Sequence, residues 1–327
     1  MVLNNPVKNV IQIGKMNGLK CLHIAMTGTG NYIPYIGIAI SSVYESNLDL
    51  PIVFHLFLND LSEAEEYRLE EVVDRYNGCI FIYIMDDKAF KKLISKDKPP
   101  VFFYRFIIAD LLKDKADRVL YMDGDVFCNG SLKKLMEIEF GENIVGVVTD
   151  RGEKRQAKRS GVSRFFNAGV VLIDVKKWCD FEIAKKSIEL SHKFLERAKR
   201  HRVRYDDQII LNIVLEGKKL FLPVKYNYLY NLSHGRIYQK DDVNQDYTEQ
   251  VIVHFAGYVK PWHSWLEDDL AVQKYLSIKD QTPWKEFPLI EPTTHKLLHQ
   301  AARYYRTRGE YTKSMNFYFK YLASKLI

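Results

Sequence analysis

The chain has 327 residues, of which 47% are hydrophobic, enough for one large packed domain with an appendage. Its net charge of +7 is unevenly distributed, because residues 293–327 contain seven Lys and Arg but one Glu, so the remaining residues are nearly neutral. A nearly neutral body argues against a nucleic-acid-binding protein, and no run of about 18 apolar residues predicts a membrane-spanning helix.

Residues 1–20 contain no apolar stretch long enough for a signal peptide. The four cysteines lack the short spacing of a metal or redox motif, so free thiols in a reducing cytosol are the simplest interpretation. The sequence therefore predicts a cytoplasmic protein.

The first half of the chain alternates apolar runs with segments of helical periodicity. We predict buried strands at residues 19–27, 51–58, 79–85 and 118–122. The intervening helices are predicted at 32–45, 62–76 and 104–112, the second opening with Ser62 and Glu65 in a capping-box pattern. Strands separated by helices indicate a Rossmann-like α/β fold, whose ligands bind beyond the carboxyl ends of the strands.

The second half mixes strands at 144–149, 165–173 and 251–255 with helices at 181–199 and 206–215. Three prolines within 281–292 predict a linker. We therefore expect a catalytic domain at residues 1–280, and a linker with a basic, aromatic helical tail at 281–327.

Asp123, Gly124 and Asp125 directly follow a predicted strand. Two carboxylates one residue apart can bind one hard cation and leave other coordination positions for phosphate oxygens. Such a cation would stabilise a departing diphosphate. The alternative is a solvent-facing turn, since Asp and Gly are common turn residues.

Three further segments carry polar groups at the ends of predicted elements. Asn167 and Ala168 precede an apolar strand, where small residues permit close approach of a ligand. Asp206 or Asp207 is expected to cap the helix that follows. His254 ends a strand and is either structural or a third metal ligand. Lys260 could meet a phosphate group.

Four segments, in this order along the chain, resemble the family 8 glycosyltransferases, most closely those that build the lipopolysaccharide core: YMDGDVFCNGSL, FFNAGVVLIDVKKW, YDDQIILN and HFAGYVKPWH. The resemblance spans about residues 20–265. It implies a GT-A type fold with a mixed sheet flanked by helices, a UDP-glucose or UDP-galactose donor, Mn²⁺ with Mg²⁺ possible, retention of anomeric configuration and a lipopolysaccharide core acceptor.

The resemblance also implies roles for individual residues. Asp123, Asp125 and His254 would be the metal ligands, and Gln208 and Asp207 the residues at the reacting sugar. The donor would further contact Ala25, Thr29, Asn31, Tyr32, Arg105, Gly124, Asn167, Ala168, Gly257 and Lys260. Relatives often have an acidic residue where this chain has Thr29, so either the hydroxyl replaces it or uracil is bound elsewhere.

Two mechanisms are compatible with retention. Gln208 is an amide and a poor nucleophile, which favours front-side attack by the acceptor, while Asp207 remains a possible nucleophile. The acceptor could also be a protein, a capsular glycan or a primer glycan, and a non-catalytic UDP-sugar-binding module or a metal-dependent hydrolase are further alternatives.

Basic residues cluster in two segments, residues 293–327 and residues 154–164. Residues 293–327 interleave them with aromatic residues, and 311–326 are predicted to form a helix with aromatic side chains on one side. That helix either lies in an anionic membrane interface, making the protein peripheral on the inner face of the cytoplasmic membrane, or packs on the catalytic domain. A basic loop at 154–164 is either an acceptor-binding loop or solvated charge.

Overall fold

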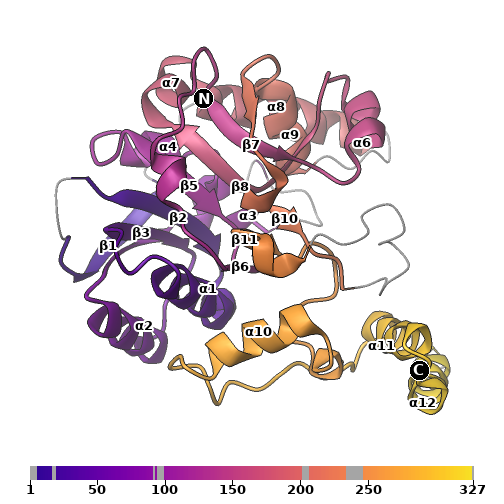
Figure 1. The fold of residues 1–327 in the computed structure, drawn as a ribbon. Coiled ribbons are helices and arrows are strands. Elements are labelled where there is room, and N and C mark those ends of the chain that lie inside the picture. The colour runs from indigo at the N-terminus through magenta and orange to yellow at the C-terminus, as the bar shows by residue number, and fades with distance from the viewer. Residues whose placement is uncertain are drawn as a thin grey trace.

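The computed structural model describes residues 6–16, 20–90, 93, 99–200, 206–232 and 246–325. The first residue of the strand predicted at 19–27, Tyr205 of the third segment and residues 326–327 of the tail lie outside these ranges. Figure 1 shows a sheet covered by helices, with a pair of helices at the C-terminus.

Within the described residues, the main sheet has eight strands. Their order is β1 (Val7–Gly14), β4 (Cys79–Met85), β3 (Ile52–Leu58), β2 (Leu22–Gly28), β5 (Arg118–Met122), β8 (Phe166–Asp174), β7 (Val145–Thr149) and β9 (Lys219–Phe221). The four strands from β4 to β5 are parallel, whereas β1 and β8 run antiparallel to their neighbours. The predicted mixed sheet is therefore confirmed.

Both faces of this sheet are buried. α1 (Ile33–Glu45) and α2 (Glu63–Tyr76) pack on one face, where their apolar side chains join Ile24 and Leu120. The other face is covered by α4 (Ile108–Leu112), α7 (Val175–Asp180), α8 (Ile183–Arg200) and α9 (Asp207–Val214). Burial on two faces explains why β3 is apolar at every position but His55, rather than alternating between apolar and polar residues.

A second, smaller sheet connects distant parts of the chain. It contains β10 (Tyr228–Leu229), β11 (Ile252–His254) and β6 (Val126–Cys128), in that order. β6 follows Asp125 directly and pairs antiparallel with β11, so that His254 lies opposite Val126. This register brings the end of β11 next to the turn between β5 and β6.

Three of the differences between the structure and the sequence predictions concern β1, residues 104–112 and residues 154–164. β1 has no counterpart among the predicted strands, because most of its side chains are exposed and it lacks an apolar alternation. The continuous helix predicted over 104–112 is wrong, since α3 (Val101–Tyr104) and α4 are separated by residues 105–107. The basic segment 154–164 is not simply a loop, because it contains most of α6 (Glu153–Ser160), which ends at left-handed Gly161.

The C-terminal region packs on the body before it reaches the helical pair. α10 (Leu270–Lys279) contacts α1, and Trp284 lies over Gly37 while its Nε1 donates to Glu65 at 2.6 Å. α11 (His295–Thr307) and α12 (Tyr311–Ala323) then form the predicted helical appendage (Figure 1). Among the described residues, no helix is both long and apolar enough to span a bilayer.

Candidate active site

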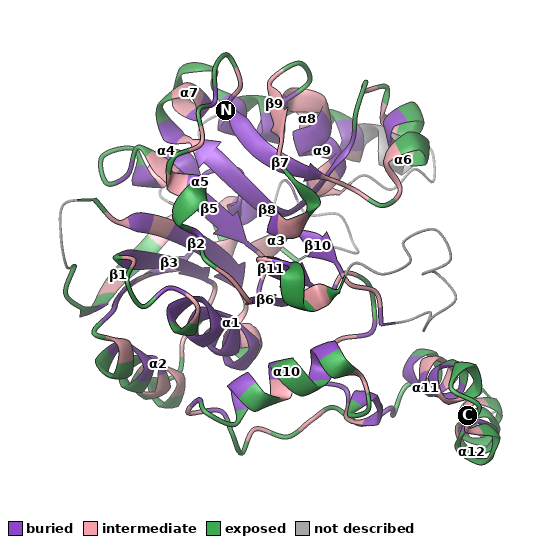
Figure 2. Cartoon of the chain, viewed as in Figure 1, coloured by how far each residue is buried: buried purple, intermediate pink, exposed green. Residues whose placement is uncertain are grey.

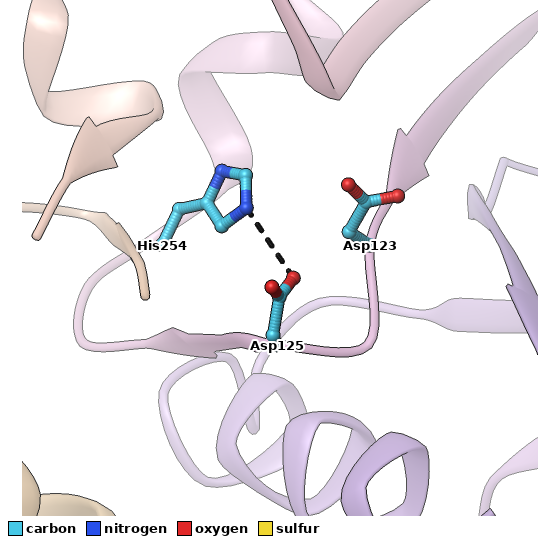
Figure 3. Close-up of side chains that lie close together, drawn as sticks. All are labelled: Asp123, Asp125 and His254. Carbon is cyan, nitrogen blue, oxygen red and sulfur yellow. Dashed lines mark ion pairs between the residues drawn. The ribbon is translucent and has the colours of Figure 1, made fainter. Parts of the chain in front are cut away.

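Three side chains from two segments converge beyond the carboxyl end of β5. Asp123 and Asp125 occupy the turn between β5 and β6, and His254 ends β11 (Figure 3). One ligand atom from each lies within 4.8 Å of the others, and His254 Nε2 is 3.3 Å from Asp125 Oδ1. The convergence predicted from the sequence is therefore present.

The surroundings of this cluster fit a divalent cation. His254 Nδ1 lies 3.0 Å from Asn227 Oδ1, so that Nδ1–H donates to the amide oxygen and the Nε2 lone pair faces the carboxylates. Asn227 in turn donates to Asn167 Oδ1 at 3.0 Å, which fixes the orientation of its amide. Two carboxylates and one imidazole form a donor set that suits Mn²⁺.

Gly169 leaves room for this cluster. A Cβ added at this position would lie 2.2 Å from His254 Cε1 and 2.8 Å from Asp123 Oδ2. The glycine also brings backbone to the site, since its carbonyl accepts from the Asp123 N–H at 2.8 Å. The Ala-Gly pair at the start of β8 therefore permits the close approach that the sequence predicted.

Asp125 is the more buried carboxylate, with 9% of its surface exposed. Burial alone would raise its pKa, but His254 in its protonated form and the Lys260 ammonium outweigh burial and lower the pKa below its ordinary value. The Lys260 ammonium contacts Asp125 Oδ2 and donates to the Phe255 carbonyl at 2.8 Å. Asp125 is thus kept ionised, as a metal ligand must be.

Arg105 connects the turn between β5 and β6 to the start of α9. Its guanidinium lies 3.0 Å from Asp123 Oδ1 and 3.1 Å from Asp207 Oδ2, and it donates to the Ala168 carbonyl at 3.0 Å. Burial acts to lower the pKa of Arg105, but Asp207, Tyr121 and Asp123 raise it, so the side chain stays charged. Tyr121 also donates to Asp123 Oδ1 at 2.6 Å.

The start of α9 supplies the remaining polar groups. Asp206 is the N-cap, because its side chain accepts from Ile209 N at 2.9 Å, which leaves Asp207 for the site. Gln208 Oε1 accepts from Ala168 N at 3.0 Å, and its Nε2 donates to Asp150 Oδ2 at 3.3 Å. The amide of Gln208 is therefore held from both ends.

The residues predicted to bind the nucleotide lie in several environments. Tyr32 packs edge-on against Trp262 at 5.6 Å and borders Gly124, where an added Cβ would lie 3.1 Å from its ring. Asn31 is exposed and Thr29 is half-buried in the turn after β2. Ala25, by contrast, is fully buried in the hydrophobic core.

The loop after β11 places Gly257 and Lys260 differently. Gly257 is exposed and adopts a positive φ of 110°, which a glycine tolerates most readily. Lys260 instead reaches into the site. The turn after β2, the β5–β6 turn and the loop after β11 thus border one site.

Sequence reasoning missed three residues that position the site. Asp150 follows a predicted strand directly, so the rule that identified Asp123 could have identified it as well. Asn227 lies before a strand of two residues, and Tyr121 lies inside an apolar run. Neither of these two carries a local signal.

Comparison with known proteins identifies the family. Residues 23–266 match the model of glycosyl transferase family 8, and residues 271–325 match the model of its C-terminal region. The chain belongs to glycosyl transferase family 8. The predicted resemblance is thereby confirmed, and the protein is a glycosyltransferase.

Similar proteins match over most of their length. The chain is 34% identical over 307 residues to a lipopolysaccharide 1,3-galactosyltransferase of Salmonella typhimurium, covering 91% of this chain and 89% of that protein. It is 27% identical over 315 residues to the lipopolysaccharide glucosyltransferase WaaO of Escherichia coli, covering 94% and 91%. The solved galactosyltransferase LgtC, in complex with donor and acceptor sugar analogues, superposes with a TM-score of 0.66 at 24% identity, covering 80% of this chain and 96% of LgtC. This similarity confirms the GT-A fold of the glycosyltransferase.

Proposed function

We propose that this family 8 glycosyltransferase moves glucose or galactose from its UDP-sugar to the lipopolysaccharide core, with retention of configuration and with Mn²⁺ as the preferred cation. The observation that carries the proposal is the convergence of Asp123, Asp125 and His254 on one point next to the turn that bears Tyr32. The names of the two relatives support the acceptor.

The proposed roles at the donor follow from the contacts. Asp123, Asp125 and His254 would hold Mn²⁺, or Mg²⁺ in its place. When bound, the cation neutralises charge on the departing diphosphate. Lys260 would leave Asp125 and contact the diphosphate as a point charge.

The remaining donor contacts are proposed from their place in the site. Asn31 and Tyr32 would bind the uridine, with Thr29 beside the base, and Gly257 would bring backbone to the diphosphate. Ala25 is buried in the core, so it would act through its packing beneath the turn.

The contacts of Asp207 favour front-side attack. A carboxylate nucleophile needs a free, activated oxygen, but Asp207 forms a buried ion pair with Arg105. Asp207 is then better suited to accept hydrogen bonds from sugar hydroxyls. Gln208, Asn167 and Ala168 are linked to one another and would line the reacting sugar. In this proposal the leaving phosphate oxygen receives the proton of the acceptor hydroxyl.

A donor screen tests the proposal. The purified protein is incubated with UDP-glucose or UDP-galactose, Mn²⁺ and truncated lipopolysaccharides, while UDP release and product mass are measured. Release of UDP together with a mass increase of one hexose supports the proposal. Transfer only to a protein or a capsular glycan would refute the acceptor, and donor binding without any transfer would indicate a non-catalytic module.

We further propose that residues 1–280 form the catalytic domain and 281–327 a membrane-associating tail, with the protein peripheral on the cytoplasmic face of the membrane. Exposed apolar residues of α12 recur at helical spacing: Tyr311, Met315, Tyr318, Phe319 and Leu322. Phe317 faces the other way and stacks on Tyr305 of α11 at 5.5 Å. Figure 2 shows that the outer side of this hairpin is largely exposed. An exposed apolar stripe on a helical hairpin with a net positive charge suits an anionic membrane interface.

A further inference from the structure

α6 packs against α9, the helix that bears Asp207 and Gln208. Ala157 is the one residue of α6 that is buried, and it packs in a small cluster with Phe165 and Ile209. Ile209 follows Gln208 in α9. The position of α6 relative to the proposed reaction centre is therefore set by packing.

Asp150, which lies three residues before the start of α6, contacts side chains of the proposed reaction centre. Asp150 Oδ2 lies 3.3 Å from Gln208 Nε2 and 3.4 Å from Asn167 Nδ2. The other oxygen of Asp150 accepts from Gly152 N at 2.7 Å, which stabilises the turn into the helix. At a rise of 1.5 Å per residue, the eight residues of α6 extend about 12 Å from this point, a length comparable to a few sugar units.

The exposed surface of α6 and of the turn before it is strongly basic. Five exposed basic residues lie within nine positions: Arg151, Lys154, Arg155, Lys158 and Arg159. The acid of this stretch, Glu153, forms an ion pair with Arg164 at 2.9 Å. Among the described residues, no carboxylate forms an ion pair with Lys154, Arg155 or Lys158, so the surface keeps its positive charge.

A role in solubility fits this surface less well than substrate binding does. Solubility alone does not require charge of a single sign beside the site. In Figure 1, α6 lies at the upper right of the molecule, in contact with α9, and the α11–α12 hairpin lies at the lower right, so contact of α6 with lipid headgroups is tested separately with vesicles. Positive charge next to a reaction centre concentrates anionic substrates there.

We propose that these five basic side chains bind phosphate groups of the acceptor saccharide, at a distance from the hydroxyl that is glycosylated. This inference rests on the proposed function and assigns it a substrate class, a phosphorylated oligosaccharide. Lys and Arg are suited to this role because both form charge-assisted hydrogen bonds with phosphate oxygens.

The test compares two double variants that lose the same charge. Arg155→Gln with Lys158→Gln changes α6, and Lys133→Gln with Lys134→Gln changes the exposed lysines of α5 (Lys133–Met136). Each is assayed with a deacylated, water-soluble core oligosaccharide, either phosphorylated or stripped of phosphate by hydrofluoric acid. The deacylated acceptor removes any contribution from a lipid surface.

We expect the α6 variant to raise the KM for the phosphorylated acceptor about tenfold, from the loss of two charge-assisted contacts. Its KM for the stripped acceptor and for the UDP-sugar should equal the wild-type values, and the α5 variant should match the wild type throughout. An equal rise for both acceptors, or no rise for either, would overturn the inference.

The outcomes also separate this inference from the function on which it rests. If the wild type transfers sugar equally well to phosphorylated and stripped acceptors, the inference alone fails. If it transfers sugar to neither, the proposed function fails with it. If the α6 variant instead loses binding to phosphatidylglycerol vesicles and keeps its KM values, the basic surface contacts lipid headgroups, and the phosphate site is refuted.

Discussion

Replacing Gly169 by alanine should disrupt the metal site while sparing the fold. The added Cβ would lie 2.2 Å from His254 Cε1, whereas carbon atoms in contact are about 3.5–4 Å apart, so the ring or the strand must move by roughly 1 Å or more. His254 cannot simply retreat, because Asn227 lies behind its Nδ1 at 3.0 Å. The same Cβ would crowd Asp123 Oδ2 at 2.8 Å.

The expected loss of Mn²⁺ affinity can be estimated from how little ligand distances vary in metal sites. Ligand distances in such sites vary by about 0.2 Å, so a displacement five times larger should lower Mn²⁺ affinity at least as much as second-shell mutations do, about 10- to 100-fold. Overpacking in a well-packed region costs about 1–3 kcal/mol of unfolding free energy. We therefore expect a folded protein with a defective metal site.

Gly130→Ala provides the matched control. A Cβ at Gly130 would meet Val251 at 3.5 Å, an ordinary contact, so this variant should keep both its stability and its metal affinity. Mn²⁺ binding in the presence of UDP is measured by electron paramagnetic resonance of the free ion, and stability by urea unfolding. Wild-type Mn²⁺ affinity in folded Gly169→Ala would refute the assigned metal geometry.

Three further predictions test other parts of the account. Lys260→Met should raise the affinity for Mn²⁺ alone several-fold and lower the affinity for UDP, because it removes the ammonium group that contacts Asp125. Calorimetric titrations of Mn²⁺ and of UDP that show neither change would contradict the roles of Lys260 at Asp125 and at the diphosphate. Asn227→Ala should weaken Mn²⁺ binding about 10- to 100-fold by leaving His254 Nδ1–H without its acceptor, and unchanged binding would show that the amide does not orient the ring. Tyr318→Ser with Phe319→Ser should reduce sedimentation with anionic vesicles while leaving kcat on a soluble acceptor unchanged; full vesicle binding would argue against the α12 surface.

Much of the fold could be predicted because its signals are local. Strands β2 to β5 are mostly apolar and buried, and α2 begins at a Ser62 cap whose side chain accepts from Glu65 N at 3.3 Å, as its sequence indicates. The edge strand β1 gave no such signal, since it is largely exposed and is defined by pairing with β4. Gly309, with a φ of 79°, separates α11 from α12, and its place in the tail could have predicted two helices.

The site was predictable only in part for a related reason. Asp123, Asp125 and His254 lie at the ends of elements in conspicuous segments, so their types and positions could be recognised. Asp150 and Asn227 act through side chains of other elements, and nothing near them in the sequence shows which partner they meet. The interruption between α3 and α4 is likewise not a matter of helix propensity. It contains Arg105, whose side chain contacts Asp123, Ala168 and Asp207 from other elements.

The central claim is tested most directly by the position of Mn²⁺ in a crystal of the protein grown with UDP. An anomalous difference map at the manganese edge should show a single peak about 2–2.4 Å from oxygens of Asp123 and Asp125 and from His254 Nε2. A crystal with UDP bound and no peak at these three side chains, or with its peak elsewhere, would contradict the account.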